Sequence, residues 1–294
     1  MKNIISVVLV VISFIVCKTN FLFNEIVSDN KIIINLKQND KVIQMELEEY
    51  LIGVVACEMP ATFYKEAIKA QAVASRTFAL SRINSNKNYI FKGNTSDQCY
   101  ITKSDMKKKW GSNYNKRYTK IKDAVSSTKG EYLTYKDKAI SALFFSMSNG
   151  YTENSEDVFV SKRAYLKSVS SPNESEYKNY IYTVSFKKKD VKKKLNLNEE
   201  ITNIKILSRF KTNRVKYIKV NNTKYSGVEF RKLLNLRSTD FDIEIEKDNI
   251  IITTRGCGHG VGMSQYGANS MAKLGYNYEE ILKHYYQKVD IKNV

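Results

Sequence analysis

Cysteine is scarce in this chain, and its spacing matches no common motif. The chain has 294 residues and four cysteines, of which Cys17 lies in an apolar N-terminal stretch. Cys57, Cys99 and Cys257 are left for the body, an odd number without a CxxC pair, so neither a zinc ribbon nor a disulfide framework is indicated. We expect free buried thiols, and a single bridge among the three remains open.

Acidic residues are also in short supply. Thirty Asp and Glu stand against 48 Lys and Arg, which gives a formal net charge of +18. Such an excess implies an anionic partner: nucleic acid, a membrane surface or an anionic envelope polymer. The basic residues are dispersed along a chain that is rich in Lys, Asn, Ile and Tyr. The charge alone therefore does not indicate nucleic-acid binding, and we predict no nucleic-acid partner. The hydrophobic share of 43% allows a large core and excludes a disordered chain.

The N-terminus contains a long uncharged stretch and lacks a cleavage site. Residues 4–17 form an uncharged, largely apolar run, and continuing it past Lys18 to residues 21–23 gives about 20 residues, the length of a membrane span. No small-x-small cleavage site follows. We therefore predict an uncleaved membrane anchor over residues 1–24 with the body outside the cytoplasm, and a cleaved signal peptide is the alternative.

Repeats are absent as well. Because no regular alternation of strand and helix occurs, the pattern favours a mixed α+β fold with an interleaved core over a doubly wound sheet. We assign residues 31–294 to one catalytic body and the basic segment 169–224 to an accessory lobe within it. The pattern predicts strand pairs at 31–36 with 42–45 and 131–135 with 139–145, a central helix over 63–83 capped by Thr62, and a hairpin of 241–246 with 250–254.

One acidic residue stands out at the predicted end of a helix. Apolar residues recur at helical spacing over residues 47–55, and Pro60 ends the pattern because the residue before a proline is pushed out of the α region. Glu58 then lies in the last turn, where the helix dipole opposes negative charge, so we expect its pKa to be raised. A carboxylic acid that keeps its proton near neutral pH can protonate a leaving group. The alternative is a solvated glutamate at a frayed helix end.

A second dense stretch covers residues 255–268 and holds five of the twelve glycines plus His259. The glycines allow backbone geometry that other residues cannot adopt and a close approach to a ligand. No Lys-Ser or Lys-Thr follows to complete a P-loop, so a nucleotide site is not indicated.

Four segments carry a resemblance to a known family. They are residues 58–60 (Glu-Met-Pro), 66–78, 146–152 and 258–268, which come in the same order as the hallmark motifs of the SpoIID/LytB family. The resemblance implies a peptidoglycan lytic transglycosylase that cleaves glycan strands between N-acetylmuramic acid and N-acetylglucosamine. It also implies a role in forespore engulfment, at the mother-cell membrane, together with the amidase SpoIIP and the membrane protein SpoIIM.

The family's catalytic glutamate precedes Met-Pro and therefore falls on Glu58. A lytic transglycosylase manages with one carboxyl group, because the muramic C6 hydroxyl replaces water as the nucleophile. By the same resemblance, the substrate-binding or positioning residues are Gln71, Arg76, Ser146, Ser148, His259 and Gln265.

A zinc site is not expected. Some relatives bind zinc with a Cys and a His near the strand before the serine-rich loop, where this chain has Phe144 and Phe145. Cys257 and His259 alone are too few for a structural zinc, which normally takes four ligands. We predict no metal and no cofactor.

Two other functions compete with the transglycosylase. A cysteine hydrolase would use Cys57 or Cys257 as nucleophile and His259 as base. A non-catalytic module would bind glycan and stimulate a cell-wall amidase, as LytB-type members of the family are described to do.

Overall fold

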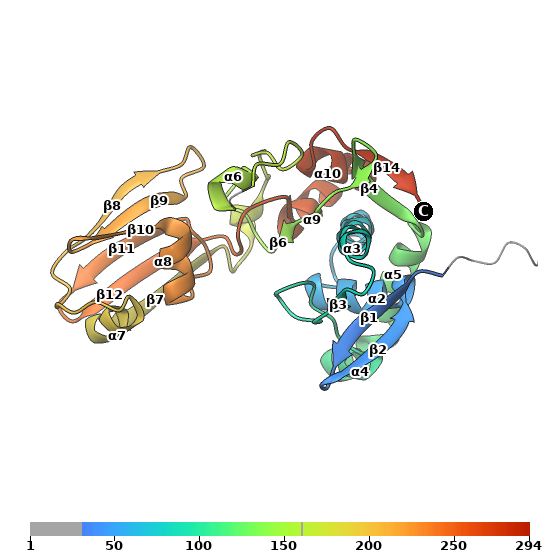
Figure 1. The fold of residues 1–294 in the computed structure, drawn as a ribbon, viewed down its shortest axis with the longest axis horizontal. Helices are drawn as coiled ribbons and strands as arrows, with labels where there is room; N and C mark the ends of the chain where they lie inside the picture. Colours follow the sequence, from blue (N-terminus) through green and yellow to red (C-terminus); the bar gives the residue numbers. More distant parts are fainter. Residues whose placement is uncertain (1–30, 160) are drawn as a thin grey trace, which may run out of the picture. The chain divides into compact units, whose positions relative to one another are not determined.

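The computed structural model describes residues 31–159 and 161–294, and the predicted anchor over residues 1–24 lies outside this range. Helices and strands are interleaved without a regular period (Figure 1), which confirms the α+β class. Within the described residues, no helix has the length and apolar character needed to cross a membrane.

Helix α3 (Lys65–Ser85) is the central element, as predicted. Ala67, Ala70 and Ala74 are fully buried, and such small residues let neighbouring elements approach closely. The elements that pack against α3 include α2 (Leu47–Glu58), α5 (Tyr114–Ser127), β4 (Glu131–Tyr135), α9 (Gln265–Lys273) and α10 (Tyr278–Tyr285).

The predicted Thr62 cap of helix α3 is wrong. The helix starts at Lys65, its N-cap is Tyr64, and no side chain caps it. The reason is a turn in which the Phe63 amide donates to the Pro60 carbonyl oxygen at 2.9 Å, so the chain reaches helical geometry only after this turn.

Helix α2 covers the residues with the predicted helical spacing and has the predicted stop. Glu58 is its last residue, and Met59 is extended, with φ −123° and ψ 138°, as a residue before proline prefers. Glu48 and Glu49 occupy its first turn.

The first strand pair is confirmed. Strands β1 (Ile33–Gln38) and β2 (Lys41–Glu46) are neighbours in one sheet, and β3 (Ile90–Phe91) pairs in parallel with β1. Asn39 and Asp40 turn the chain in the left-handed region, with φ values of 48° and 61°.

The predicted strand over residues 139–145 is wrong, because it is divided between two sheets. Its start, β5 (Lys138–Ala139), pairs with β4, which also pairs with β14 (Asp290–Asn293). Its end, β6 (Phe144–Phe145), pairs in parallel with β13 (Met263–Ser264). This second pairing brings the loop that begins at Ser146 next to the start of helix α9.

The remaining strands form two three-stranded sheets. One has the order β11 (Phe241–Glu246), β12 (Asn249–Arg255), β7 (Ile181–Lys187), and the other has the order β10 (Thr223–Ser226), β9 (Val215–Val220), β8 (Ile204–Arg209). The predicted hairpin is confirmed, with Phe241 opposite Thr254 and Glu246 opposite Asn249.

The predicted accessory segment 169–224 shares its core with later residues. Strand β7 pairs with β12, and Val191 and Ile218 belong to the same buried apolar cluster as Phe241 and Ile252. The domain bounds stay a prediction. The elements not yet given are α4 (Lys103–Trp110), η1 (Gly111–Asn113), α6 (Ser155–Val158), η2 (Glu174–Glu176), α7 (Lys188–Lys194) and α8 (Gly227–Leu234).

Arg76 joins three of these elements from inside the core. Its side chain is fully buried, and its Nε and Nη2 donate to the two carboxylate oxygens of Glu48, both at 2.7 Å. Nη1 and Nη2 also donate to the carbonyl oxygens of Glu131 and Val125, at 3.0 and 3.3 Å. These contacts tie helix α3 to α2, β4 and α5.

Arg76→Met should lower the free energy of unfolding by about 3–5 kcal/mol, because it leaves Glu48 and two carbonyl groups without their buried donor. Urea unfolding measures this change. The control is Lys283→Met, which breaks the exposed pair with Glu279 in helix α10 and should cost at most about 1 kcal/mol. Equal losses in the two variants would contradict a structural role of Arg76.

Candidate functional site

Glu58 is a partly buried carboxyl group held by two donors from distant parts of the chain. The backbone amide of Cys99 donates to Glu58 Oε1 at 2.6 Å, and the side chain of Gln265 also donates to this carboxylate. Burial raises the pKa of Glu58, while the two hydrogen bonds act to lower it. The predicted rise is confirmed, and its main cause is burial rather than the helix end.

A disulfide bond fixes one of these donors. Cys57 and Cys99 are bonded across a separation of 42 residues, so the expectation of free thiols is wrong for this pair, while Cys257 is free. Because Cys57 precedes Glu58 and the Cys99 amide contacts it, the bond holds the loop around residue 99 against the end of helix α2. A separation of 42 residues matches no motif that would reveal the pairing.

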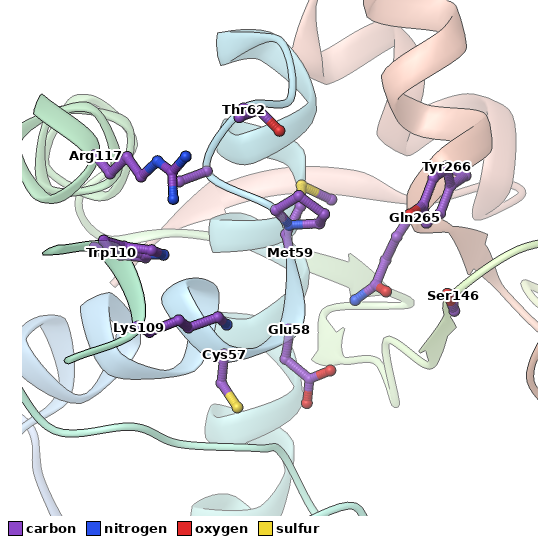
Figure 2. A pocket seen from close by; sticks show the side chains of 12 residues that line it. Cys57, Glu58, Met59, Thr62, Lys109, Trp110, Arg117, Ser146, Gln265 and Tyr266 are labelled. Atoms are coloured by element: carbon purple, nitrogen blue, oxygen red, sulfur yellow. The ribbon is translucent and has the colours of Figure 1, made fainter. Parts of the chain in front are cut away.

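Two cavities meet at Glu58. The first, of about 470 Å³, is lined by Glu58, Ser146 and Gln265 together with Trp110 and Tyr266 (Figure 2). The second, of about 450 Å³, is lined by residues that include Glu58 and His259. An acid that lines two cavities suits a chain-like substrate that passes the acid and is cut beside it.

Gln265 is the residue that reaches Glu58 from the glycine-rich region. It begins helix α9, whose N-cap Ser264 accepts from the Gly267 amide, and its side chain extends toward the end of helix α2 (Figure 2). Its Nε2 also donates to Gln71 Oε1 at 3.3 Å, and an amide nitrogen has two hydrogens for two acceptors. Gln71 is fully buried and donates in turn to Ser75, so its link to Glu58 runs through Gln265.

The two predicted loop serines have different surroundings. Ser146 lines the first cavity, whereas Ser148 is fully buried and donates through its amide and its hydroxyl to Glu174, at 2.8 and 2.6 Å. Arg76, held by Glu48, is absent from the lining of both cavities.

Glu174 is a site residue that sequence reasoning missed. It is 1% exposed, and besides Ser148 it accepts from the hydroxyls of Ser171 and Ser264, at 2.6 and 2.7 Å. Burial raises its pKa. Since Ser264 caps helix α9, Glu174 joins the serine loop to the helix that carries Gln265. No local pattern marks it, because its partners come from three separate segments.

The backbone holds the His259 ring. Nδ1 accepts from the Val261 amide at 3.1 Å, and the backbone of Phe144 also interacts with the ring. Burial, with Arg231 and Arg214 nearby, lowers its pKa from 6.5 to about 4. The ring is therefore neutral at pH 7 and fixes the glycine loop against strand β6.

The glycine-rich stretch adopts the geometry that only glycine readily takes. Gly256, Gly258, Gly260 and Gly262 all have positive φ. A Cβ on Gly262 would lie 2.0 Å from the carbonyl oxygen of Leu143, so this loop packs directly on the chain that leads into strand β6.

This geometry does not support a cysteine hydrolase. Cys57 is bonded to Cys99, and Nδ1 of His259 accepts from the Val261 amide, so that nitrogen does not serve Cys257 as a base. In the described part of the chain, no three side chains of His, Cys, Asp or Glu lie where they could hold a metal ion.

His259 predicts a pH dependence of stability. The unfolded chain binds its proton near pH 6.5 and the folded chain only near pH 4, so the free energy of unfolding falls as the pH drops through this window. The loss is complete below about pH 4 and amounts to about 2 kcal/mol, since the ring is still partly exposed.

Urea unfolding at pH 7 and pH 4 measures this loss, and His259→Gln should remove it. His284→Gln, at the other histidine of the chain, is the matched control and should keep it. A pH dependence in His259→Gln as steep as in the unchanged chain would contradict the assignment.

Comparison with known proteins shows the family of this chain. The family profile described as SpoIID, stage II sporulation protein, matches residues 35–135. Stage II sporulation protein D of Bacillus amyloliquefaciens is 46% identical over 261 residues, covering 86% of this chain and 76% of that protein. The Bacillus subtilis (strain 168) protein of the same name is 44% identical over the same coverage.

A further relative has a different name. The amidase enhancer of Bacillus subtilis (strain 168) is 30% identical over 292 residues, covering 80% of this chain and 39% of that protein. On the identity and coverage of the first two relatives, the chain belongs to the stage II sporulation protein D (SpoIID) family.

Proposed function

We propose that this protein is a peptidoglycan lytic transglycosylase, with Glu58 as its acid and base. The observation that carries the proposal is a partly buried, hydrogen-bonded carboxyl group with a raised pKa that lines two cavities. Glu58 is the only acid among the described residues that line the first cavity. Asp97 lines the second cavity, but its oxygens accept from the Tyr89 hydroxyl and the Lys92 amide. Hydrolytic glycosidases normally use two carboxyl groups, so one available acid favours an internal nucleophile.

The proposed reaction needs one group that acts twice. Protonated Glu58 donates its proton to the glycosidic oxygen, and the bond from that oxygen to the muramic C1 breaks. The resulting carboxylate is held by the Cys99 amide and the Gln265 side chain. It then accepts the proton of the muramic C6 hydroxyl while that oxygen bonds to C1, which closes a 1,6-anhydro ring and restores the acid.

The cellular setting belongs to the same proposal. Membership in the SpoIID family supports a role in sporulation, and we infer action in forespore engulfment from the mother-cell membrane, through the anchor predicted over residues 1–24. SpoIIP and SpoIIM are the proposed partners. The relative named amidase enhancer supports a link to an amidase.

Glu58→Gln should reduce cleavage of peptide-free glycan strands by about 100- to 10,000-fold, the usual contribution of general acid–base catalysis. Mass spectrometry of the digest should show products ending in 1,6-anhydro-muramic acid with the unchanged chain only. Glu49→Gln, at an exposed position of the same helix, is the control and should cleave normally. Reducing ends in place of anhydro ends would instead mean hydrolysis by water.

A second function is supported by the amidase enhancer among the relatives. A pure glycan-binding stimulator would leave strands uncut and raise the rate of a cell-wall amidase. Amidase release of stem peptides is measured with the unchanged chain and with Glu58→Gln. We expect Glu58→Gln to retain any stimulation, because binding does not require the proton. Stimulation by both proteins without any cleavage would select the stimulator over the transglycosylase.

A further inference from the structure

The second cavity beside Glu58 contains two arginines that the proposed reaction does not use. Arg82 comes from helix α3 and Arg231 from helix α8, and both line the cavity together with Glu58 and His259. We call this space the arginine cavity.

Both guanidinium groups have a buried nitrogen without a hydrogen-bond acceptor. The atoms are Nε of Arg82 and Nε of Arg231, and neither has an acceptor among residues 31–159 and 161–294. The Arg82 guanidinium lies over the rings of Phe78 and Tyr89, with its central carbon 4.8 and 5.9 Å from the ring centres. Stacking of this kind fixes the orientation of the group and leaves its donors available.

Neither arginine has a carboxylate partner in the described part of the chain, where ion pairs are formed by other residues. Asp97 lines the same cavity, but its oxygens accept from the Tyr89 hydroxyl and the Lys92 amide. Partly buried cations without a counter-charge are unfavourable. The arrangement is therefore suited to an anion that arrives with the ligand.

The glycan strand carries a group of this kind. Each muramic acid has a lactyl substituent that ends in a carboxylate, and this charge is lost when a stem peptide is attached through an amide. N-acetylglucosamine lacks the substituent. Phe144 and Phe159 also line the cavity, and aromatic rings provide an apolar surface for a sugar ring.

We propose that Arg82 and Arg231 form a subsite for the lactyl carboxylate of a muramic acid that lies next to the bond cleaved at Glu58. The subsite rests on the proposed function for its ligand, since it takes the glycan strand as substrate. Arginine suits this task because its planar fork binds a carboxylate with two parallel hydrogen bonds.

The test compares two forms of one ligand on the full-length chain carrying Glu58→Gln, purified in detergent so that no strand is cut. The first ligand is peptide-free glycan strands, and the second is the same strands with their carboxylates converted to methylamides. Calorimetry should show that methylamidation weakens binding by at least about tenfold, because hydrogen bonds to charged groups are lost.

Variants then locate the effect. Adding Arg82→Gln or Arg231→Gln should weaken binding of the unmodified strands by about tenfold and leave binding of the methylamide strands unchanged. Lys283→Gln removes an exposed cation from helix α10 and should change neither. If the net charge of the whole chain caused the difference, all three variants would lose the same affinity for the unmodified strands.

Two results would overturn the subsite. One is equal binding of the two ligands by the chain with intact arginines, a comparison that does not depend on the folding of any arginine variant. The other is that the arginine variants bind neither the unmodified strands nor the methylamide strands. Cleavage is not measured here, so failure of the transglycosylase assay and failure of the subsite are separate results.

Discussion

The contact between the Cys99 amide and the Glu58 carboxylate is the interaction on which the site depends. At 2.6 Å, it joins the end of helix α2 to a loop that is distant in sequence, and the Cys57–Cys99 bond holds both sides together. Pro60 makes the geometry available, because it ends the helix directly after Glu58. A carboxyl group at a longer, frayed helix end would lie in solvent and keep an ordinary pKa.

The second half of the site reaches Glu58 through a buried polar network. Glu174 accepts from the serine loop and from the Ser264 cap of helix α9, so the positions of Ser146 and Gln265 are linked. A buried carboxyl group with this many donors is stable only while all of them stay in place. The network therefore fixes the distance between the two segments more firmly than apolar packing alone.

Local patterns were predictable from the sequence, and long-range pairings were not. Helix α2, its stop at Pro60 and the hairpin around residues 247–248 follow from spacing and turn residues. The Cys57–Cys99 bond, the division of residues 139–145 between two sheets and the contacts of Glu174 depend on which segments meet in space. The sequence placed Arg76 near the substrate because its pairing with Glu48 is also long-range. A buried arginine of this kind has no local pattern that distinguishes it from a substrate-binding one.

A mechanism with one carboxyl group sets a narrow condition on its pKa. The acid must hold a proton before the glycosidic bond breaks, and the same group must be stable as a carboxylate until it takes the C6 proton. Burial alone would satisfy the first requirement and oppose the second. The amide of Cys99 and the side chain of Gln265 supply the opposite influence, since both donate to the charged form. The two donors are therefore as necessary to the proposed cycle as the burial itself, which explains why a disulfide bond and a glycine-rich loop converge on one glutamate.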